Sequence, residues 1–274
     1  MDVIEIIKDA FVFPSKNIKL LLIFVLLSVL ASVFSVLGTL VYALGVITPE
    51  CFLWGGLACV VAMLIGWILL GYSITVVKSG IEHDDKVPEF DWWENFFTGF
   101  NNFVVSIVYF IIPAFITVVA GYLTNIYGNF MTVFQQIVLI ASDTYTGSSA
   151  VVYDGLAQAI VNLAVSSAIT IFVALIVFVI FSFLQYMAEA RLANTGSLRQ
   201  ALNVFEAAKD ISRIGAGKVI SVVILIFVIG LVVEMFFSAF FSFMPIFSFL
   251  SVVISPYLLL FTQRAIGLLY SDIA

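Results

Sequence analysis

Hydrophobic residues along the chain form long uninterrupted runs, and short polar or charged segments separate one run from the next. A helix rises about 1.5 Å per residue and a hydrocarbon core is about 30 Å thick, so a run of roughly 20 apolar residues can span a membrane. Five runs reach that length, and they cover about residues 18–46, 52–77, 103–123, 156–187 and 219–270.

The last run is too long for one transmembrane helix. Its 52 residues would extend over roughly 78 Å as a single rod, well beyond the hydrocarbon thickness. We therefore expect a hairpin whose turn falls at residues Ser242 to Pro245. The pattern as a whole predicts an all-α polytopic membrane protein with six transmembrane helices in three hairpins.

Three shorter segments carry apolar residues at three- and four-residue intervals, which is typical of amphipathic helices. They cover residues 2–13, 88–100 and 197–214, and each precedes one hairpin. The candidate interfacial anchors of the second segment are Trp92, Trp93, Phe96 and Phe97. The apolar face expected for the third consists of Leu198, Ala201, Leu202, Phe205, Ala208 and Ile211. Such a helix lies either at the membrane interface or on the protein's own surface, and the pattern leaves both open.

Residues 125–154 separate the third and fourth runs and contain no Lys or Arg. We expect a long loop here, with a short helix over 130–141 that dips into the outer membrane interface. Loops of this length are usually either functional or flexible.

Composition excludes an ordinary soluble domain. The chain is 63% hydrophobic and 10% charged, whereas about a quarter of the residues of a soluble domain are charged. Cys51 and Cys59 lie eight residues apart in or beside one apolar run, and we interpret them as small packing residues rather than a disulfide.

The basic residues give the orientation. In the six-span topology all eleven lie on the same side of the membrane: Lys8, Lys16, Lys19, Lys78, Lys86, Arg191, Arg199, Lys209, Arg213, Lys218 and Arg264. Loops rich in Lys and Arg stay in the cytoplasm. We therefore expect a multi-pass protein of the cell membrane with cytoplasmic N- and C-termini and three cytoplasmic amphipathic helices.

The same order of elements occurs three times, which predicts an internal repeat within a single membrane domain, residues 1–274. Each unit consists of an amphipathic helix and two spans, and the units cover about residues 2–80, 88–196 and 197–274. Gly71-Tyr72 before Lys78 and Gln185-Tyr186 before Arg191 mark similar membrane exits. Repeats of this kind pack similar hairpins around a pseudo-symmetry axis.

Two blocks of the chain resemble an uncharacterised, domain-of-unknown-function family of archaeal and bacterial integral membrane proteins. The first block carries Gly71-Tyr72, Lys78, Gly80, Pro88, Phe90-Asp91-Trp92 and Gly99. The second carries Glu189-Ala190-Arg191 and Ile214-Gly215. The architecture is also similar to membrane domains found beside some glycerophosphodiester phosphodiesterases, without their catalytic portion. The family has no established activity, so the resemblance implies no functional residue.

Glu234 is the acidic residue well inside an apolar run, and an ionisable group at membrane depth is a candidate functional site. It lies about sixteen residues after Lys218, or roughly 24 Å of helix, which places it toward the outer leaflet. It is either a proton or cation site, or a group that simply reaches the interface or stays protonated. Glu189 and Arg191, at the cytoplasmic end of the fourth span, are candidates for contact with a lipid headgroup or a neighbouring helix.

Other chemistry finds little support in the sequence. The single histidine, His83, stands in an acidic loop that we interpret as solvated rather than as a metal site, and it leaves no Ser-His-Asp set. There is no Gly-rich phosphate loop, and the basic residues are too few and too mixed with acids for nucleic acid. We expect no catalytic residue, cofactor or metal, and no enzymatic activity.

The functional hypothesis is a non-enzymatic membrane protein that organises lipid or partner proteins at the cytoplasmic face. Its expected partners are membrane lipid and either another membrane protein or a second copy of the chain. The alternative is a small-molecule or ion transporter or channel built on the repeat, with a central path shaped by Pro113, Pro256 and Glu234.

Overall fold

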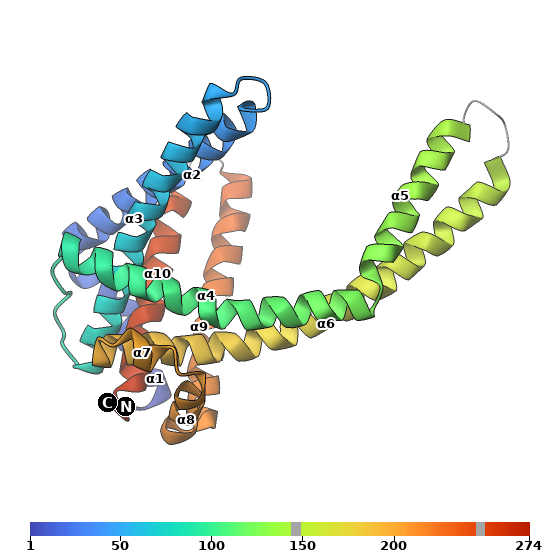
Figure 1. Ribbon diagram of the computed structural model, residues 1–274. Coiled ribbons are helices and arrows are strands. Elements are labelled where there is room, and N and C mark those ends of the chain that lie inside the picture. The colour runs from blue at the N-terminus through green and yellow to red at the C-terminus, as the bar shows by residue number, and fades with distance from the viewer. Residues whose placement is uncertain (144–148, 245–249) are drawn as a thin grey trace. The chain divides into compact units, whose positions relative to one another are not determined.

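The computed structural model describes residues 1–143, 149–244 and 250–274, and the regular structure in these ranges is helical throughout (Figure 1). The elements are α1 (Val3–Val12), the 3-10 helix η1 (Phe13–Lys16), α2 (Ile18–Leu44), α3 (Glu50–Ile81), α4 (Trp92–Leu123), α5 (Ile126–Asp143), α6 (Ser149–Thr195), α7 (Leu198–Ala201), α8 (Val204–Ile214), α9 (Ala216–Phe243) and α10 (Ser251–Tyr270). The all-α class expected from the sequence is confirmed.

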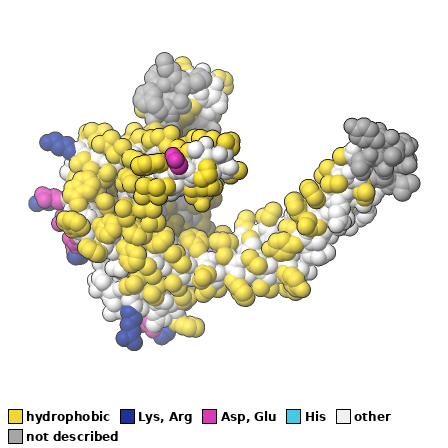
Figure 2. Space-filling model, turned by 45° about the horizontal axis from the view of Figure 1, so that its top comes forward, with side chains coloured by type: hydrophobic (Ala, Val, Ile, Leu, Met, Phe, Trp, Pro, Cys, Tyr) yellow, Lys and Arg dark blue, Asp and Glu magenta, His cyan; other side chains and the backbone are white. Residues whose placement is uncertain are grey.

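Six of these helices are long and apolar enough to cross a membrane, as the hydrophobic runs predict: α2, α3, α4, α6, α9 and α10. Large apolar side chains are exposed along most of them. Figure 2 shows one face covered mainly by hydrophobic side chains, with charged side chains in a few small groups. Such a surface is stable only against lipid, so the chain is a multi-pass membrane protein.

The chain divides into two compact units. The first comprises Met1–Ser106 and Leu184–Ala274, and the second comprises Ile107–Phe183. Helices α4 and α6 each run from one unit into the other. The threefold repeat and the single membrane domain stay predictions, because this division follows contacts and does not compare the repeat units with one another.

Local capping explains where the first helices begin. The Asp2 side chain accepts a hydrogen bond at the start of α1, and Glu5 reaches back to the Asp2 backbone to complete a capping box. Pro14 lies in η1, directly after the end of α1. The side chain of Asn17 then accepts from the Leu20 N–H at 3.3 Å and begins α2.

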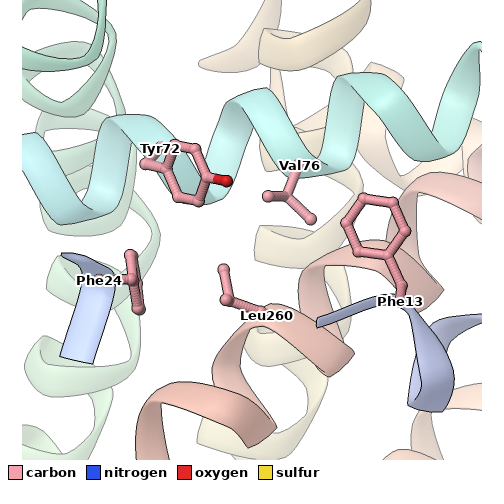
Figure 3. Close-up of a cluster of buried hydrophobic side chains, with 5 residues drawn as sticks. All are labelled: Phe13, Phe24, Tyr72, Val76 and Leu260. Carbon is pink, nitrogen blue, oxygen red and sulfur yellow. The ribbon is translucent and has the colours of Figure 1, made fainter. Parts of the chain in front are cut away.

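A buried cluster joins these N-terminal elements to the spans of the first unit. It consists of Phe13, Phe24, Tyr72, Val76 and Leu260, from η1, α2, α3 and α10 (Figure 3). The Tyr72 hydroxyl donates to the carbonyl oxygen of Pro88 at 3.1 Å, so the cluster also fixes the segment between α3 and α4.

Glycines let the helices of the first unit approach closely. A Cβ atom at Gly71 of α3 would lie 1.7 Å from the carbonyl oxygen of Asn95, and one at Gly99 of α4 would lie 1.6 Å from that of Trp67. Helix α3 also meets α10, where a Cβ at Gly267 would lie 2.2 Å from the Val77 oxygen. Lipid chains are as apolar as the helices, so close backbone approach of this kind is a main source of helix association in membranes.

The expected boundary between the second amphipathic helix and the third span is wrong. Trp92–Leu123 is one continuous helix, because no Pro or Gly-rich turn interrupts the chain where the apolar run begins near Phe103. Asp91 caps its start by accepting from the Trp93 and Glu94 N–H groups at 3.0 and 2.9 Å.

The expected long loop over residues 125–154 is also wrong for the part that is described. Helix α5 covers Ile126–Asp143, which includes the short helix predicted over 130–141, and α6 already begins at Ser149. In the second unit the Asn129 side chain of α5 donates to Ser166 of α6 at 3.1 Å. Ile126–Ala141 is an apolar helical stretch that is shorter than the six candidate spans.

Candidate functional site

Arg264 of α10 is the centre of a buried polar network at the end of the first unit that carries both termini. Its side chain is 1% exposed. It donates to Asp9 Oδ1 at 2.9 Å, to the Asp84 carbonyl oxygen at 2.8 Å and to Ser79 Oγ at 3.3 Å. Its guanidinium also lies 4.3 Å from the centre of the Phe13 ring. A planar cation with five donors suits such a site, since each contact lies in a different direction.

Lys16 extends this Arg264 network toward solvent. Its Nζ lies 3.7 Å from Asp9 and 3.1 Å from Asp85. The hydrogen bond and charge of Lys16 hold the pKa of the exposed Asp85 carboxyl below its ordinary value. The network therefore ties α1, η1 and the α3–α4 segment to α10.

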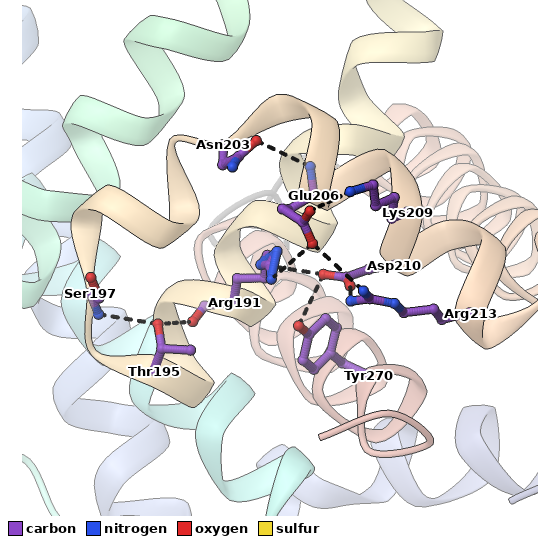
Figure 4. A network of polar contacts seen from close by, with 9 residues as sticks. All are labelled: Arg191, Thr195, Ser197, Asn203, Glu206, Lys209, Asp210, Arg213 and Tyr270. Carbon is purple, nitrogen blue, oxygen red and sulfur yellow. Dashed lines mark hydrogen bonds and ion pairs between the residues drawn. The ribbon is translucent and has the colours of Figure 1, made fainter.

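A second network surrounds Arg191 near the end of α6 (Figure 4). Its guanidinium lies 3.4 Å from Asp210 and 3.8 Å from Glu206, both on α8. Asp210 is 1% exposed and also accepts from Arg213 at 3.0 Å and from the Tyr270 hydroxyl at 3.1 Å. A buried carboxylate of this kind is tolerated because cations and a hydroxyl satisfy its oxygens.

The outer part of this Arg191 network is exposed to water. Lys209 donates to Glu206 at 2.6 Å, and that bond, with the charges of Lys209, Arg213 and Arg191, lowers the pKa of the Glu206 carboxyl. Two networks thus hold the chain segments together at one end of the first unit, and each contains a buried ionised group.

The third amphipathic segment differs from the expected single helix. It breaks into α7 and α8 because the Asn203 side chain caps α8 by accepting from the Glu206 N–H at 3.2 Å. Helix α8 turns Asp210 and Ala207 toward the protein and leaves Phe205 83% exposed. The inward face of α8 therefore combines the apolar residues Val204, Ala207, Ile211 and Ile214 with the buried Asp210, and Phe205 lies outside it.

Glu189 and Arg191 both contact neighbouring helices, but they belong to different clusters. The Glu189 carboxyl is buried and accepts from Gln185 Nε2 at 3.0 Å and from Gln263 Nε2 of α10 at 3.4 Å. Residues two apart on a helix do not face each other, which explains why Arg191 pairs with α8 instead. Contact of either residue with a lipid headgroup stays a prediction.

The four aromatic anchor candidates point in different directions. Trp92, Trp93 and Phe97 are 53%, 76% and 61% exposed. Phe96 instead packs against Trp67 of α3, with 5.6 Å between the ring centres. The start of α4 therefore presents three aromatic side chains outward while α3 holds the helix from behind.

Glu234 lies on α9 at a pocket of about 410 Å³ between α9 and α10. The lining residues are Glu234, Phe237, Ser238, Phe241, Ser242, Ser251, Ile254 and Ser255. No cation pairs with Glu234 in the part of the chain that the structure describes. Pro256 borders a second pocket, whereas Pro113 belongs to the second unit, so the path expected through all three residues stays a prediction.

The sequence did not reveal the buried positions of Arg264 and Asp210 or the pairing of Arg264 with the partly exposed Asp9. One signal was present for Arg264, since most residues from Leu258 to Leu269 are apolar and a cation in such a run needs a partner.

His83, the histidine of the acidic loop, lies in the turn after α3 and has a positive φ of 53°. Within residues 1–143, 149–244 and 250–274, no group of three or more His, Cys, Asp or Glu could hold a metal ion.

Comparison with known proteins gives one match. A family model described as "Protein of unknown function (DUF4013)" matches residues 54–242. No curated protein and no solved structure matches the chain. The expected similarity to membrane domains beside glycerophosphodiester phosphodiesterases is not shown by these comparisons.

Proposed function

The chain belongs to this DUF4013 family of unknown function, and from that premise we propose that it is a non-enzymatic membrane protein that organises lipid or partner proteins at the cytoplasmic face. The observation that carries the proposal is the outward row of Trp92, Trp93 and Phe97 at the start of α4. Tryptophan is enriched at membrane interfaces because its ring is apolar and its N–H is polar.

The surroundings of this aromatic row support a fixed contact surface. Gly71 and Gly99 bring α4 against the backbone of α3, and Trp67 packs between Phe96 and Phe100 with ring centres 5.6 and 5.0 Å away. A side chain held in place before binding loses less conformational entropy when it meets lipid or a partner.

The orientation proposed from the sequence agrees with the position of the two termini. Lys218 donates to Asp272, and the N-terminal amine lies 3.7 Å from the same carboxyl group, so both termini lie at one end of the first unit. The positive-inside rule assigns that end, with the Arg264 and Arg191 networks, to the cytoplasm.

Tryptophan quenching tests the seating of the aromatic row. In a Trp54→Phe/Trp67→Phe background only Trp92 and Trp93 fluoresce. We expect lipids brominated near the headgroup to quench them more strongly than lipids brominated near the chain end. Quenching by neither lipid would contradict an interfacial position.

Capture of lipid and partners is tested by replacing the exposed rings alone. We expect Trp92→Ser/Trp93→Ser/Phe97→Ser to retain less lipid and fewer partner proteins after mild extraction, as measured by native mass spectrometry. Phe115→Ser, at an exposed position further along α4, is the matched control. Equal retention by the triple variant and the wild type would refute the proposal.

A second candidate, transport of a small molecule or ion, is supported by the Glu234 pocket. Serine hydroxyls and a carboxylate beside a span are unusual in lipid and are typical of substrate or ion pathways. Flux measured in proteoliposomes tests this candidate, and flux that Glu234→Gln leaves unchanged would exclude a path through this pocket.

A further inference from the structure

The pocket between α9 and α10 is built from one polar face of each helix. On α9 the lining residues recur at three- and four-residue intervals from Glu234 to Ser242, and on α10 Ser251 and Ser255 stand one turn apart. The exposed large side chains beside Glu234 on α9 are apolar, namely Val232, Met235 and Phe236. A carboxylate, four serines and two phenylalanines therefore line one open groove, in which Glu234 and the serines are exposed.

The hydroxyl groups continue beyond this pocket as a band around the first unit. Ser251 and Ser255 also line a pocket of about 510 Å³ against α2, which contributes Ser28 and Ser32. Ser32 in turn borders a third pocket, with Ser35. Ser32, Ser35, Ser251 and Ser255 are exposed, so these hydroxyl groups lie at open grooves between neighbouring spans.

The charge of this region selects a cation. From residue 219 to residue 263 the sequence contains no Lys, Arg or His, and Glu234 is its one acidic residue. Among the lining serines, the hydroxyl of Ser242 donates to the Ser238 carbonyl oxygen at 2.9 Å, which leaves the Ser242 hydroxyl oxygen as an acceptor. An anion would meet a carboxylate and lone pairs with no positive partner, so anions are excluded on electrostatic grounds.

The size and shape of the pocket select among cations. A metal ion bound in lipid needs several ligands at about 2–2.6 Å, and one carboxylate in about 410 Å³ does not supply a compact shell. That volume lies in the range of small-molecule sites, which is about 300–1,000 Å³. Phe237 and Phe241 line the pocket, and aromatic rings attract ammonium groups through cation–π contact.

We propose that the α9–α10 pocket binds an ammonium group, with Glu234 as its counter-ion, Phe237 and Phe241 as its aromatic contacts and the lining serines as its polar neighbours. The ammonium is carried either by a small solute or by a lipid headgroup. This site shares no residue with the aromatic row at the start of α4, and its test measures only whether the pocket is occupied. The ammonium site and the proposed lipid or partner contact can therefore fail independently of each other.

Protection of Glu234 from a membrane-soluble carbodiimide is the direct test. The wild-type protein in nanodiscs is treated with dicyclohexylcarbodiimide, and the adduct at Glu234 is quantified by peptide mass spectrometry. We expect benzyltrimethylammonium to suppress the adduct and its neutral carbon isostere, neopentylbenzene, to leave it unchanged. Equal suppression by both compounds, or by neither, overturns the proposal.

Calorimetry on variants gives an independent measurement. We expect Glu234→Gln to bind benzyltrimethylammonium at least about tenfold more weakly, because a charge-assisted contact is lost. Glu50→Gln, at an exposed carboxylate at the start of α3 and outside the pocket, is the matched control and should bind as the wild type does. Unchanged affinity of Glu234→Gln, with the fold verified by circular dichroism, would refute the assignment.

Nanodiscs of different lipid composition distinguish a lipid headgroup from a free solute as the source of the ammonium group. If a headgroup supplies it, nanodiscs that contain phosphatidylethanolamine should lower the Glu234 adduct without any added solute, relative to nanodiscs of phosphatidylglycerol. If a solute supplies it, both nanodiscs should give the same adduct until benzyltrimethylammonium is added.

Discussion

At the scale of single residues, Arg264 has the largest expected effect on stability. Removing one partner of a buried ion pair costs about 3–5 kcal/mol, because the other charge stays buried without compensation. Asp9 is partly exposed, so we expect Arg264→Gln to lower the free energy of unfolding by about 3 kcal/mol. Thermal unfolding in detergent measures this change.

Two further variants make the Arg264 prediction specific. Arg199→Gln removes an exposed arginine and should change stability by less than about 0.5 kcal/mol. In a double-mutant cycle, Asp9→Asn and Arg264→Gln should be strongly coupled because their side chains are 2.9 Å apart. If the effects of the two substitutions on the free energy of unfolding were additive, the Asp9–Arg264 ion pair would contribute no interaction energy to stability.

Acid should weaken the exposed ends of both networks. Lys16 lowers the pKa of Asp85, and Lys209 is the main cause of the lowered pKa of Glu206. A lowered folded-state pKa gives stabilisation that is complete above the ordinary value of about 4 and is lost as the pH falls through the folded-state value. The melting temperature of the wild type should therefore approach that of Asp85→Asn/Glu206→Gln between about pH 5 and pH 2.

This pH effect is small because both carboxylates are exposed. A stability difference between the wild type and the double variant that stays constant from neutral pH to the lowest pH would contradict the ion pairs. High salt at neutral pH should reduce the same difference, since exposed charges are screened.

Few of these residues could be identified from the sequence alone. Glu234 could be found because its neighbours along the chain are apolar, so a single position was conspicuous. The pairs of Arg264 with Asp9 and of Arg191 with Asp210 join residues 255 and 19 positions apart, and no local pattern connects such partners. Only the packing of α1 and α8 against the spans brings them together.

At the scale of helices, the crossing of α3 and α4 depends on two glycines. A methyl group at Gly71 would lie 1.7 Å from a backbone oxygen that cannot move without displacing α4. Overpacking typically costs about 1–3 kcal/mol, so we expect Gly71→Ala to destabilise the protein by about 2 kcal/mol or more. Thermal unfolding and the emission maximum of Trp67 would report the change.

Helix α3 supplies a matched control for this substitution. A Cβ at Gly66 meets nothing within 4 Å, so Gly66→Ala adds helix propensity without a clash. It should be neutral or stabilising by up to about 1 kcal/mol. If both alanine variants behaved alike, the close approach of α3 and α4 would not be needed for the fold.

Most helices could be predicted from the sequence, while two boundaries could not. Helices α2, α3, α9 and α10 could be predicted from the length of their hydrophobic runs alone, because the thickness of the hydrocarbon core requires runs of that length. Helix α4 is continuous because no Pro or Gly-rich turn interrupts it near Phe103, and the break between α7 and α8 depends on capping by Asn203, a weaker signal than hydrophobicity. The expected apolar face of α8 was shifted, because the helix turns Val204, Ala207, Ile211 and Ile214 inward together with Asp210 and leaves Phe205 exposed.

At the scale of the whole molecule, the proposed function requires one particular orientation of the chain in the membrane. The proposed lipid or partner contact needs α1, α8 and the start of α4 on the cytoplasmic side, and the α2–α3 turn on the opposite side. The distribution of all eleven basic residues along the sequence supports that orientation.

Single-cysteine labelling in intact cells is the most direct measurement of this orientation. In a Cys51→Ser/Cys59→Ser background, Ile47→Cys in the exposed α2–α3 turn should react with a membrane-impermeant maleimide added outside. Lys209→Cys on α8, whose side chain is 61% exposed, should react only after the membrane is permeabilised. Labelling of both positions from the same side, or of Lys209→Cys alone in intact cells, would contradict the topology and the function proposed from it.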